Sequence, residues 1–465
     1  MDEKKESAAK GFMLSAVLWL FISTAVGLIV AIKFVYPDFL GGVSWLTFGR
    51  LRMVHVNGVI FGWLSMAYIG SFYYIVPRLT GVPLYSERLA NLTLWLWNFL
   101  VIGAVVTLAL GMNQGHEYAE LIMPLDVLVG GLFIFIIINI FATVLGRKEH
   151  QLYVSLWYIM GSLIWTATLY IVENGFLFFD LTGLGGRSLY YGVNDANINW
   201  WYGHNVVGFW LTTPGLAIAY FFLPKAIQTP IYSHRLSLIG FWSIAFIYIW
   251  TGAHHLIYAP IPMWLQALAI IFSVLLIIPV SVVVTNFFGT MKGQWVRLHD
   301  NIPVKFIIAG TVFYLITCLQ GPLQSIWRVS QLVHFTDWVV GHAHLAVAGF
   351  ASMFASAAIY YAIPRLYRRE LYSQGLANWH FWLFTIGMAT MALSLWFGGL
   401  VQGSMWNVNV PFTETMKALR PYWSSRVLSG AFMVLSHAIF AYNIYKTVTL
   451  GKPVGEAESM GGSAL

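Results

Sequence analysis

The chain has 465 residues, of which 59% are hydrophobic and only 9% are charged. A soluble domain carries about 25% charged residues, so this scarcity of charge excludes a water-soluble fold of this size. In lipid the surface needs no such charge. The formal charge of +7 comes from basic residues in short loops between apolar runs, so it indicates membrane topology and no nucleic-acid partner.

A membrane-spanning helix needs about 20 mostly apolar residues. The predicted spans, in chain order, are 11–34, 52–77, 90–111, 125–146, 152–174, 200–223, 237–258, 264–288, 303–323, 338–363, 377–400 and 427–447. No long linker separates a second domain. We therefore expect an all-α fold: a bundle of about 12 transmembrane helices, forming a single domain over residues 1–465 with a flexible tail at 451–465.

The basic residues predict the orientation. Twelve spans place both termini on one side, and sixteen of the 25 Lys and Arg residues fall on that side against eight on the other. Positively charged loops stay in the cytoplasm, so both termini are expected there. Two exceptions, Arg50 and Arg52, directly precede a histidine-bearing span. They are candidate partners for haem propionates, with ordinary interfacial placement as the alternative.

Six of the 13 histidines form a constellation. Ionisable residues inside a span are costly and mark functional sites. The six are His55, His204, His254, His255, His342 and His344. Because the spans alternate in direction, all six fall in the outer third of the membrane, away from the termini. The others are interpreted as loop residues or, for His380 and His437, as solitary hydrogen-bonded packing residues.

The tenth span carries two of these histidines, two residues apart. Residues at that spacing on an α-helix point about 200° apart, so His342 and His344 face opposite sides of the helix. They cannot chelate one small ion, but each can bind a different large cofactor. His55 can pair with one of them as the two axial ligands of a six-coordinate haem.

The other three histidines predict a metal site. His254 and His255 point about 100° apart on a helix, and with His204 they make a three-imidazole set with an open position. Such a set suits catalytic copper, zinc or iron. Tyr248 lies seven residues before His255, on nearly the same helical face. Its phenol can donate a proton or an electron there; the alternative is a buried tyrosine bonded to a backbone carbonyl.

This pattern resembles the catalytic subunit I of the haem–copper oxidase superfamily, from the second span to the twelfth. The six histidines in matched order and the Gly-His-Ala-His run at 341–344 carry the resemblance. A tyrosine in the same helix as the His-His pair is similar to the C family, the cbb-type cytochrome c oxidases. In the A and B families the functional tyrosine follows the first copper histidine by four residues, where this chain has Gly208.

The resemblance implies two haem b groups. His55 and His344 would be the axial ligands of the low-spin haem, and His342 would be the proximal ligand of the high-spin haem. A segment at 115–121 resembles a family segment that holds calcium near the haem propionates. Glu117 is the candidate calcium ligand, because calcium prefers oxygen donors; a solvated loop carboxylate is the alternative.

The resemblance also implies one copper ion, held by His204, His254 and His255 opposite the high-spin haem. Tyr248 would be the redox-active tyrosine, cross-linked to His204. Cleaving dioxygen without releasing peroxide needs four electrons at once, and a haem iron, a copper and a phenol can supply them together.

The implied reaction is that of a terminal respiratory oxidase. Dioxygen would be reduced to water with electrons from cytochrome c through the low-spin haem, coupled to proton uptake. The implied partners are membrane-bound monohaem and dihaem cytochrome c subunits, and the implied location is the bacterial inner membrane, with lipid around the bundle. No Cys-x-x-Cys-His haem attachment motif occurs in this chain.

Gln320 departs from the family pattern, which usually has a glutamate at this position. A glutamine cannot take up or release a proton. The main alternative function is therefore a nitric oxide reductase of the same superfamily, with non-haem iron in the metal site. Two further alternatives are a transporter without cofactors and an isolated electron-transfer haem protein. A transporter does not predict Gly-His-Ala-His with four more histidines at equal depth. An electron-transfer haem protein would explain His55 and His344, but not the trio of His204, His254 and His255.

Overall fold

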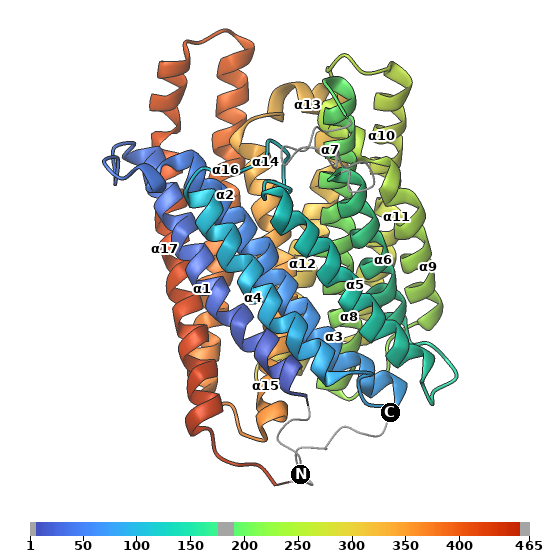
Figure 1. Cartoon of the computed structure of the whole chain (residues 1–465). Helices are drawn as coiled ribbons and strands as arrows, with labels where there is room; N and C mark the ends of the chain where they lie inside the picture. The colour runs from blue at the N-terminus through green and yellow to red at the C-terminus, as the bar shows by residue number, and fades with distance from the viewer. Residues whose placement is uncertain (1–5, 175–189, 456–465) are drawn as a thin grey trace.

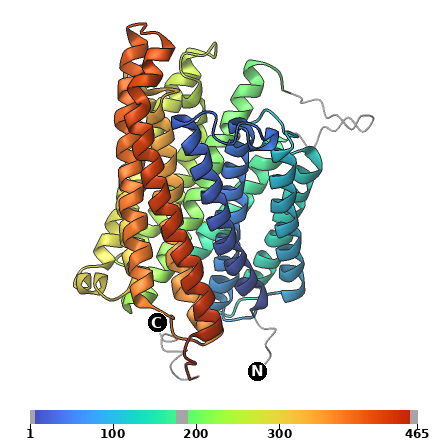
Figure 2. The same cartoon turned by 90° about the vertical axis from the view of Figure 1, so that its left-hand side faces the viewer.

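The computed structural model describes residues 6–174 and 190–455. Over these ranges it contains twelve helices that are long and apolar enough to cross a membrane, and no named strand. The all-α prediction and the twelve predicted spans are confirmed. Figures 1 and 2 show the helices in one bundle, with the start of α1 and the end of α17 at the same end. We call this end the termini side and the opposite end the far side.

Seven spans are single helices. They are α1 (Ser7–Val35), α4 (Glu87–Ala109), α5 (Met123–Leu145), α6 (Val154–Glu173), α12 (Ile302–Ser325), α16 (Gln374–Asn407) and α17 (Phe412–Leu450). The last two are much longer than the predicted 377–400 and 427–447, and they reach past the other helices on the far side (Figure 1). Apolar length alone marks only the part of a helix that lies in lipid.

The other five spans change their geometry along their length. Three contain a π-helical segment between two α-helices. The first consists of α2 (Phe48–Asn57), η2 (Gly58–Ser65) and α3 (Met66–Thr80). The second consists of α7 (Val193–Val206), η4 (Val207–Thr212) and α8 (Thr213–Ile227), and the third of α14 (Asp337–His344), η8 (Leu345–Ala351) and α15 (Ser352–Tyr367). One ends in 3₁₀ turns: α9 (His234–Ile247), η5 (Tyr248–Trp250) and η6 (Gly252–Leu256). One is divided at Leu276 into α10 (Met263–Leu275) and α11 (Ile277–Thr290). A short helix, α13 (Trp327–Val333), connects α12 to α14.

The three spans with π-helical segments form the centre of the bundle. Their apolar stretches are 100%, 94% and 89% buried inside the protein, whereas no other span exceeds 61%. Each π segment begins one to three residues after a histidine, namely His55, His204 or His344. Insertions of this kind in an α-helix are frequent at functional sites. The most buried helices of the fold are thus the ones that carry these three histidines.

A polar contact on the termini side occurs three times in the fold. Ser86, Ser233 and Ser373 each cap the N-terminus of a helix through the side chain. Their backbones exchange two hydrogen bonds with a buried asparagine of the next helix, respectively Asn139, Asn286 and Asn443. Spans 3, 7 and 11 are therefore fixed to spans 4, 8 and 12 in the same way.

The start of the predicted tail is held by hydrogen bonds. The Glu370 N–H donates to the Lys452 carbonyl at 2.9 Å, and the Val454 N–H donates to the Arg368 carbonyl at 2.9 Å. The chain therefore remains bound to the loop before α16 for several residues after α17 ends. The rest of the predicted tail, residues 456–465, lies outside the described residues.

Candidate metal and haem centre

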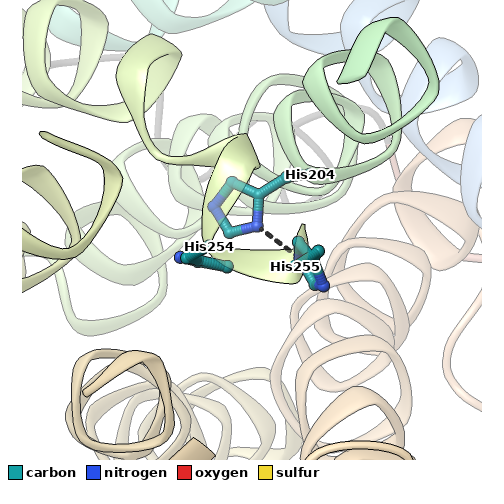
Figure 3. A group of neighbouring side chains, drawn as sticks. All are labelled: His204, His254 and His255. Atoms are coloured by element: carbon teal, nitrogen blue, oxygen red, sulfur yellow. Dashed lines mark hydrogen bonds between the residues drawn. The ribbon is translucent and has the colours of Figure 1, made fainter. Parts of the chain in front are cut away.

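His204, His254 and His255 converge on one point. One nitrogen from each ring lies within 4.8 Å of the other two, and His204 Nδ1 is 3.0 Å from His255 Nε2 (Figure 3). His204 comes from α7, whereas the adjacent pair comes from η6, at the far-side end of a neighbouring span. Three imidazoles without a carboxylate suit copper, zinc or iron.

The surroundings of the three rings fit a metal. Ser273 Oγ donates its hydrogen to the Ala269 carbonyl at 2.6 Å, so the contact of 2.6 Å with His254 Nδ1 requires the proton on that nitrogen. The other nitrogen of His254 is then unprotonated and able to bind a metal. His204 Nε2 is buried and has no hydrogen-bond partner among the described residues. The His255 ring stacks on Trp200 at 4.0 Å between centroids, which fixes its plane.

The backbone around the adjacent histidines is not the regular α-helix assumed for the predicted geometry. Gly252 lies so close to α7 that a Cβ there would be 2.6 Å from the Trp200 carbonyl oxygen. Only glycine allows this approach. The chain therefore tightens into 3₁₀ turns, and the predicted angle of about 100° between His254 and His255 does not describe the site.

Tyr248 lies against the three-histidine site, beside His204, the partner that the family resemblance implies. Its ring stacks on His204 with centroids 4.8 Å apart and an interplanar angle of 19°. The expected placement on the face of His255 is wrong, because α9 ends at Ile247 and no regular helix joins the two residues. A Cβ at Gly208 would lie 2.3 Å from the Tyr248 ring. The missing side chain at 208 thus provides the space for the phenol at 248.

A second ligand set lies between α2 and α14. The rings of His55 and His344 are nearly parallel, at 17°, with centroids 6.3 Å apart. Metal–imidazole bonds are about 2.0–2.1 Å long, so two rings that hold one iron ion from opposite sides have centroids roughly 6 Å apart. Their Nδ1 atoms are each 2.8 Å from a backbone carbonyl oxygen, of Ser23 and Val340 respectively. Both Nδ1 atoms therefore carry the proton, and both Nε2 atoms are free to bind iron.

His342 lies apart from this pair. Its Nδ1 donates to Oε1 of Gln320 from α12 at 3.0 Å, and Gln320 is itself buried. His342 Nε2 is then the nitrogen available to an iron ion. The sequence did not reveal this contact, because it joins two spans through side chains with no shared motif. Gln320 therefore acts on the site through His342, as a neutral hydrogen-bond acceptor.

On the far side, Arg52, a candidate propionate partner, binds Glu117, the candidate calcium ligand. Arg52 forms an ion pair with Glu117 and lies 3.7 Å from Glu120, while Arg50 donates to the Ala109 carbonyl at 3.2 Å. Glu120 accepts a hydrogen bond from Asn57 at 3.0 Å, and burial raises the pKa of its carboxyl above the ordinary value. Two carboxylates that suit calcium thus lie together here, and the positive charge beside them is that of Arg52.

Arg426 was missed as a site residue. It was assigned to the loop before the predicted last span, but it lies well inside α17 and is buried. Its Nη1 has no hydrogen-bond partner among the described residues, and its guanidinium lies over the Phe34 ring, 4.8 Å from the centroid. A buried arginine with an unused donor suits an anionic group such as a haem propionate. The feature of the sequence that could have identified Arg426 is its position directly before a long apolar run.

The fold and these ligand sets define a haem–copper oxidase subunit I. The chain belongs to the cytochrome c and quinol oxidase polypeptide I family, whose model matches residues 7–432. It is 35% identical over 450 residues to the cbb3-type cytochrome c oxidase subunit CcoN1 of Stutzerimonas stutzeri, covering 95% of this chain and 94% of that protein. The predicted likeness to the cbb-type oxidases is therefore confirmed.

Two further comparisons place the chain more broadly. A solved structure of a haem–copper terminal oxidase dimer matches with a TM-score of 0.78 and 18% identity, over 96% of this chain and 85% of that one, which supports the fold. A nitric oxide reductase chain of Stutzerimonas stutzeri is 26% identical over 475 residues, 95% of this chain and 94% of that protein. The reductase is thus a more distant relative than the cbb3-type oxidase.

Proposed function

We propose that the chain is the catalytic subunit of a terminal respiratory oxidase that reduces dioxygen to water. The observation that carries the proposal is the stacking of Tyr248 on His204, in space left free by Gly208. A phenol at that position can give an electron and a proton to a substrate bound at the three-histidine site. In this family a covalent bond between Tyr248 and His204 would hold the two rings together.

The proposed cofactors are two haem b groups and one copper ion. His55 and His344 would hold the low-spin haem, and His342 the high-spin haem, with Gln320 orienting the His342 ring. Arg50, Arg52 and Arg426 are the candidate propionate partners. When bound, the haems carry electrons to the site and bind oxygen. The parallel rings of His55 and His344 support the first assignment.

Copper at His204, His254 and His255 is supported by the donor set. All three donors are imidazoles, and Gly208 offers no carboxylate to the metal. Ser273 contacts His254 and Trp200 stacks on His255, so two of the three rings are held in place by the protein itself. This fixed geometry leaves the Tyr248 phenol beside the metal site.

We further propose a calcium ion near Glu117. The support is the cluster of Glu117 and Glu120 beside Arg52, from which carboxylate oxygens can bind a hard cation. Calcium would take over Glu117 from Arg52, and Arg52 would then be free for a propionate.

The proposed electron donor is cytochrome c, through membrane-bound monohaem and dihaem cytochrome c subunits. The support is the similarity to a cbb3-type cytochrome c oxidase subunit. The chain itself contains no haem attachment motif, so a c-type haem must be supplied by another subunit. We place the protein in a bacterial inner membrane with both termini in the cytoplasm, on the distribution of Lys and Arg. Proton uptake from the termini side would accompany the reaction.

The alternative function is nitric oxide reduction with non-haem iron in the three-histidine site. The match to a nitric oxide reductase chain over 95% of the sequence favours it, and so does Gln320 in place of the usual glutamate. Gly208 and Tyr248 favour the oxidase, because they replace a carboxylate ligand with a phenol.

A metal count separates these functions. The purified complex is analysed for iron, copper and haem by elemental analysis and pyridine haemochrome spectra, after subtraction of the haem of its c-type subunits. The oxidase predicts two haem b and one copper per chain. Iron in excess of haem with no copper would show that the reductase is correct, and the absence of both haems would exclude either enzyme.

A further inference from the structure

His380 and His437 are not the solitary packing residues expected from the sequence. They lie on α16 and α17, are 0% and 1% exposed, and face each other with ring centroids 6.0 Å apart. The Nε2 atom of each ring is buried without a hydrogen-bond partner among the described residues. Such orphaned polar atoms are costly in a protein interior, so this pair requires an explanation other than packing.

The proton positions on the pair can be deduced. Thr24 Oγ1 donates its hydrogen to the Leu20 carbonyl at 2.7 Å, so it can only accept from His437 Nδ1, 3.1 Å away. His437 Nε2 is then a basic nitrogen with a free lone pair. His380 Nδ1 lies 3.0 Å from the Tyr360 hydroxyl. When that hydroxyl donates to Nδ1, the proton of His380 lies on Nε2, and the pair presents one donor and one acceptor.

One end of this chain of groups reaches a cavity on the termini side. The cavity has a volume of about 250 Å³ and is lined by Tyr360, Asp300, Arg365 and Gln374, among others. These residues lie where α12 and α16 begin and α15 ends, so the cavity opens at that end of the bundle. Tyr360 thus connects the cavity to His380.

The other end approaches the proposed low-spin haem. Thr24, the partner of His437, is preceded in α1 by Ser23. The Ser23 carbonyl accepts the hydrogen bond from His55 Nδ1. Gly27, one helical turn on, leaves room for the His55 ring, since a Cβ there would be 2.5 Å from it. The helix that holds His437 in place is therefore the helix that holds the haem ligand.

The titratable groups that face the pair are few. Tyr360 of α15 bonds to His380, and Lys305 of α12 binds Asn378, two residues before His380. α1 contributes the neutral hydroxyl of Thr24. The remaining ring contacts are aromatic, from Phe306, Phe384 and Phe440. In such a low-dielectric environment an uncompensated positive charge on the pair is disfavoured, so the pair can hold an extra proton only when a compensating electron arrives, as on reduction of the haem.

We propose that His380 and His437 form a buried proton-binding pair that takes up a proton from the termini side when the haem between His55 and His344 is reduced. This rests on the proposed function for that haem. His437 gains one N–H bond at Nε2, with the proton supplied by water of the cavity, for each electron that the haem receives from its c-type cytochrome donor. Oxidation of the haem releases the same proton. A water molecule between the two Nε2 atoms, or a turn of one ring, connects them.

The test is a redox titration of the low-spin haem in the purified complex between pH 6 and pH 9. A one-electron couple that binds one proton shifts by about 59 mV for each tenfold change in proton concentration, and the unmodified protein is expected to show a large part of this slope. In His437→Asn the amide still donates to Thr24, but the basic nitrogen is lost. We expect the slope to fall by at least half. His150→Gln, at an exposed loop histidine on the termini side, keeps the original slope.

A second variant keeps the test decisive if His437→Asn does not assemble. Tyr360→Phe removes the hydroxyl between the cavity and His380 but leaves both histidines in place. We therefore expect the pH dependence of the haem potential to be retained. Proton uptake after rapid reduction of the haem, measured with a pH dye, should slow at least tenfold. An unchanged slope in His437→Asn, or an unchanged uptake rate in Tyr360→Phe, overturns the proposal. A complex without a bis-histidine haem spectrum would instead refute the proposed function.

Discussion

The two ligand sets are built on different backbones. His55 and His344 project from α-helical turns, and each ring is fixed by a backbone carbonyl. His254 and His255 lie in 3₁₀ turns that Gly252 brings against α7. The first site is thus made by packing two spans that are α-helical where they carry the ligands and change to π-helical geometry just after them. The second depends on a local distortion and on side chains such as Ser273, so we expect it to be more sensitive to small changes around it.

The largest effect is expected from removing a haem ligand. His344→Ala leaves His55 without its opposite ring, so the low-spin haem spectrum and oxygen consumption should both be lost, while copper remains at one per chain. Optical spectra and metal analysis of the purified complex measure this. His255→Ala should give the converse, with copper lost and the low-spin spectrum kept. Loss of both cofactors in either variant would show that the two sites are not independent.

Replacing the phenol tests the chemistry of the second site alone. Tyr248→Phe keeps the ring that stacks on His204 but removes the hydroxyl. Because a positioned proton donor contributes about 10²–10⁴-fold to a rate, oxygen consumption should fall by at least about 100-fold with haem and copper contents unchanged. Tyr68→Phe is the control, since among the described residues this buried hydroxyl donates to the Leu211 carbonyl at 2.8 Å and to none of the three histidines. Normal turnover by Tyr248→Phe would disprove its role.

A methyl group at 208 tests whether the position of the phenol matters. Gly208→Ala places a Cβ 2.3 Å from the Tyr248 ring, which must move. A displacement of about 1 Å can cost about 100-fold in rate, and we expect a loss of that order. Gly131→Ala is the matched control, because a Cβ there has no neighbour within 4 Å. Equal activities in the two variants would mean that the Tyr248 ring is free to shift without consequence.

Removing a hydroxyl beside the copper ligands should have a smaller effect. Ser273→Ala leaves His254 Nδ1 without its acceptor, so the ring is less well oriented. Changes to such partners typically cost about 10–100-fold in metal affinity, and we expect about a tenfold weaker retention of copper against a chelator. Ser243→Ala is the control, because that hydroxyl bonds its own helix. The two variants should differ only in copper content.

The smallest effect is expected at Gln320. Gln320→Glu replaces a neutral acceptor of the His342 N–H with a carboxylate, and a charged hydrogen bond is about 1 kcal/mol stronger. The carboxylate stabilises the oxidised iron, so the potential of the high-spin haem should fall by some tens of millivolts. Gln324→Glu, one turn along α12 and bonded to Trp338, should leave it unchanged. A rise in the potential would contradict this role.

The sequence predicts the site well where regular helices carry it. Apolar length indicates all twelve spans, and an α-helical angle places His342 and His344 on opposite faces, where the structure has them contacting different partners. The prediction fails where the geometry is irregular. A regular helix would place Tyr248 on the face of His255. It stacks instead on His204, the partner that the resemblance implied, because a 3₁₀ turn depends on the close approach of Gly252 to another helix. Such tertiary contacts leave no period in the sequence.

Contacts between distant spans were also out of reach. Gln320 was noted only as a departure from a pattern, and its bond to His342 could not be deduced from positions 22 residues apart on two helices. Arg426 was assigned to a loop because the apolar run begins after it, although α17 continues through it. His380 and His437 were separated by 57 positions, and nothing local shows that they face each other.

The contact between serine and asparagine that recurs on the termini side has a consequence for how the chain enters the membrane. It divides the twelve spans into three sets of four, each ending with the asparagine-bearing helix. Four is an even number, so every set starts and finishes on the same side and all three insert in parallel orientation. Corresponding helices then share one depth without any further constraint. The three histidines that precede the π segments lie on the second helix of each set, and their common level follows from a parallel triplication.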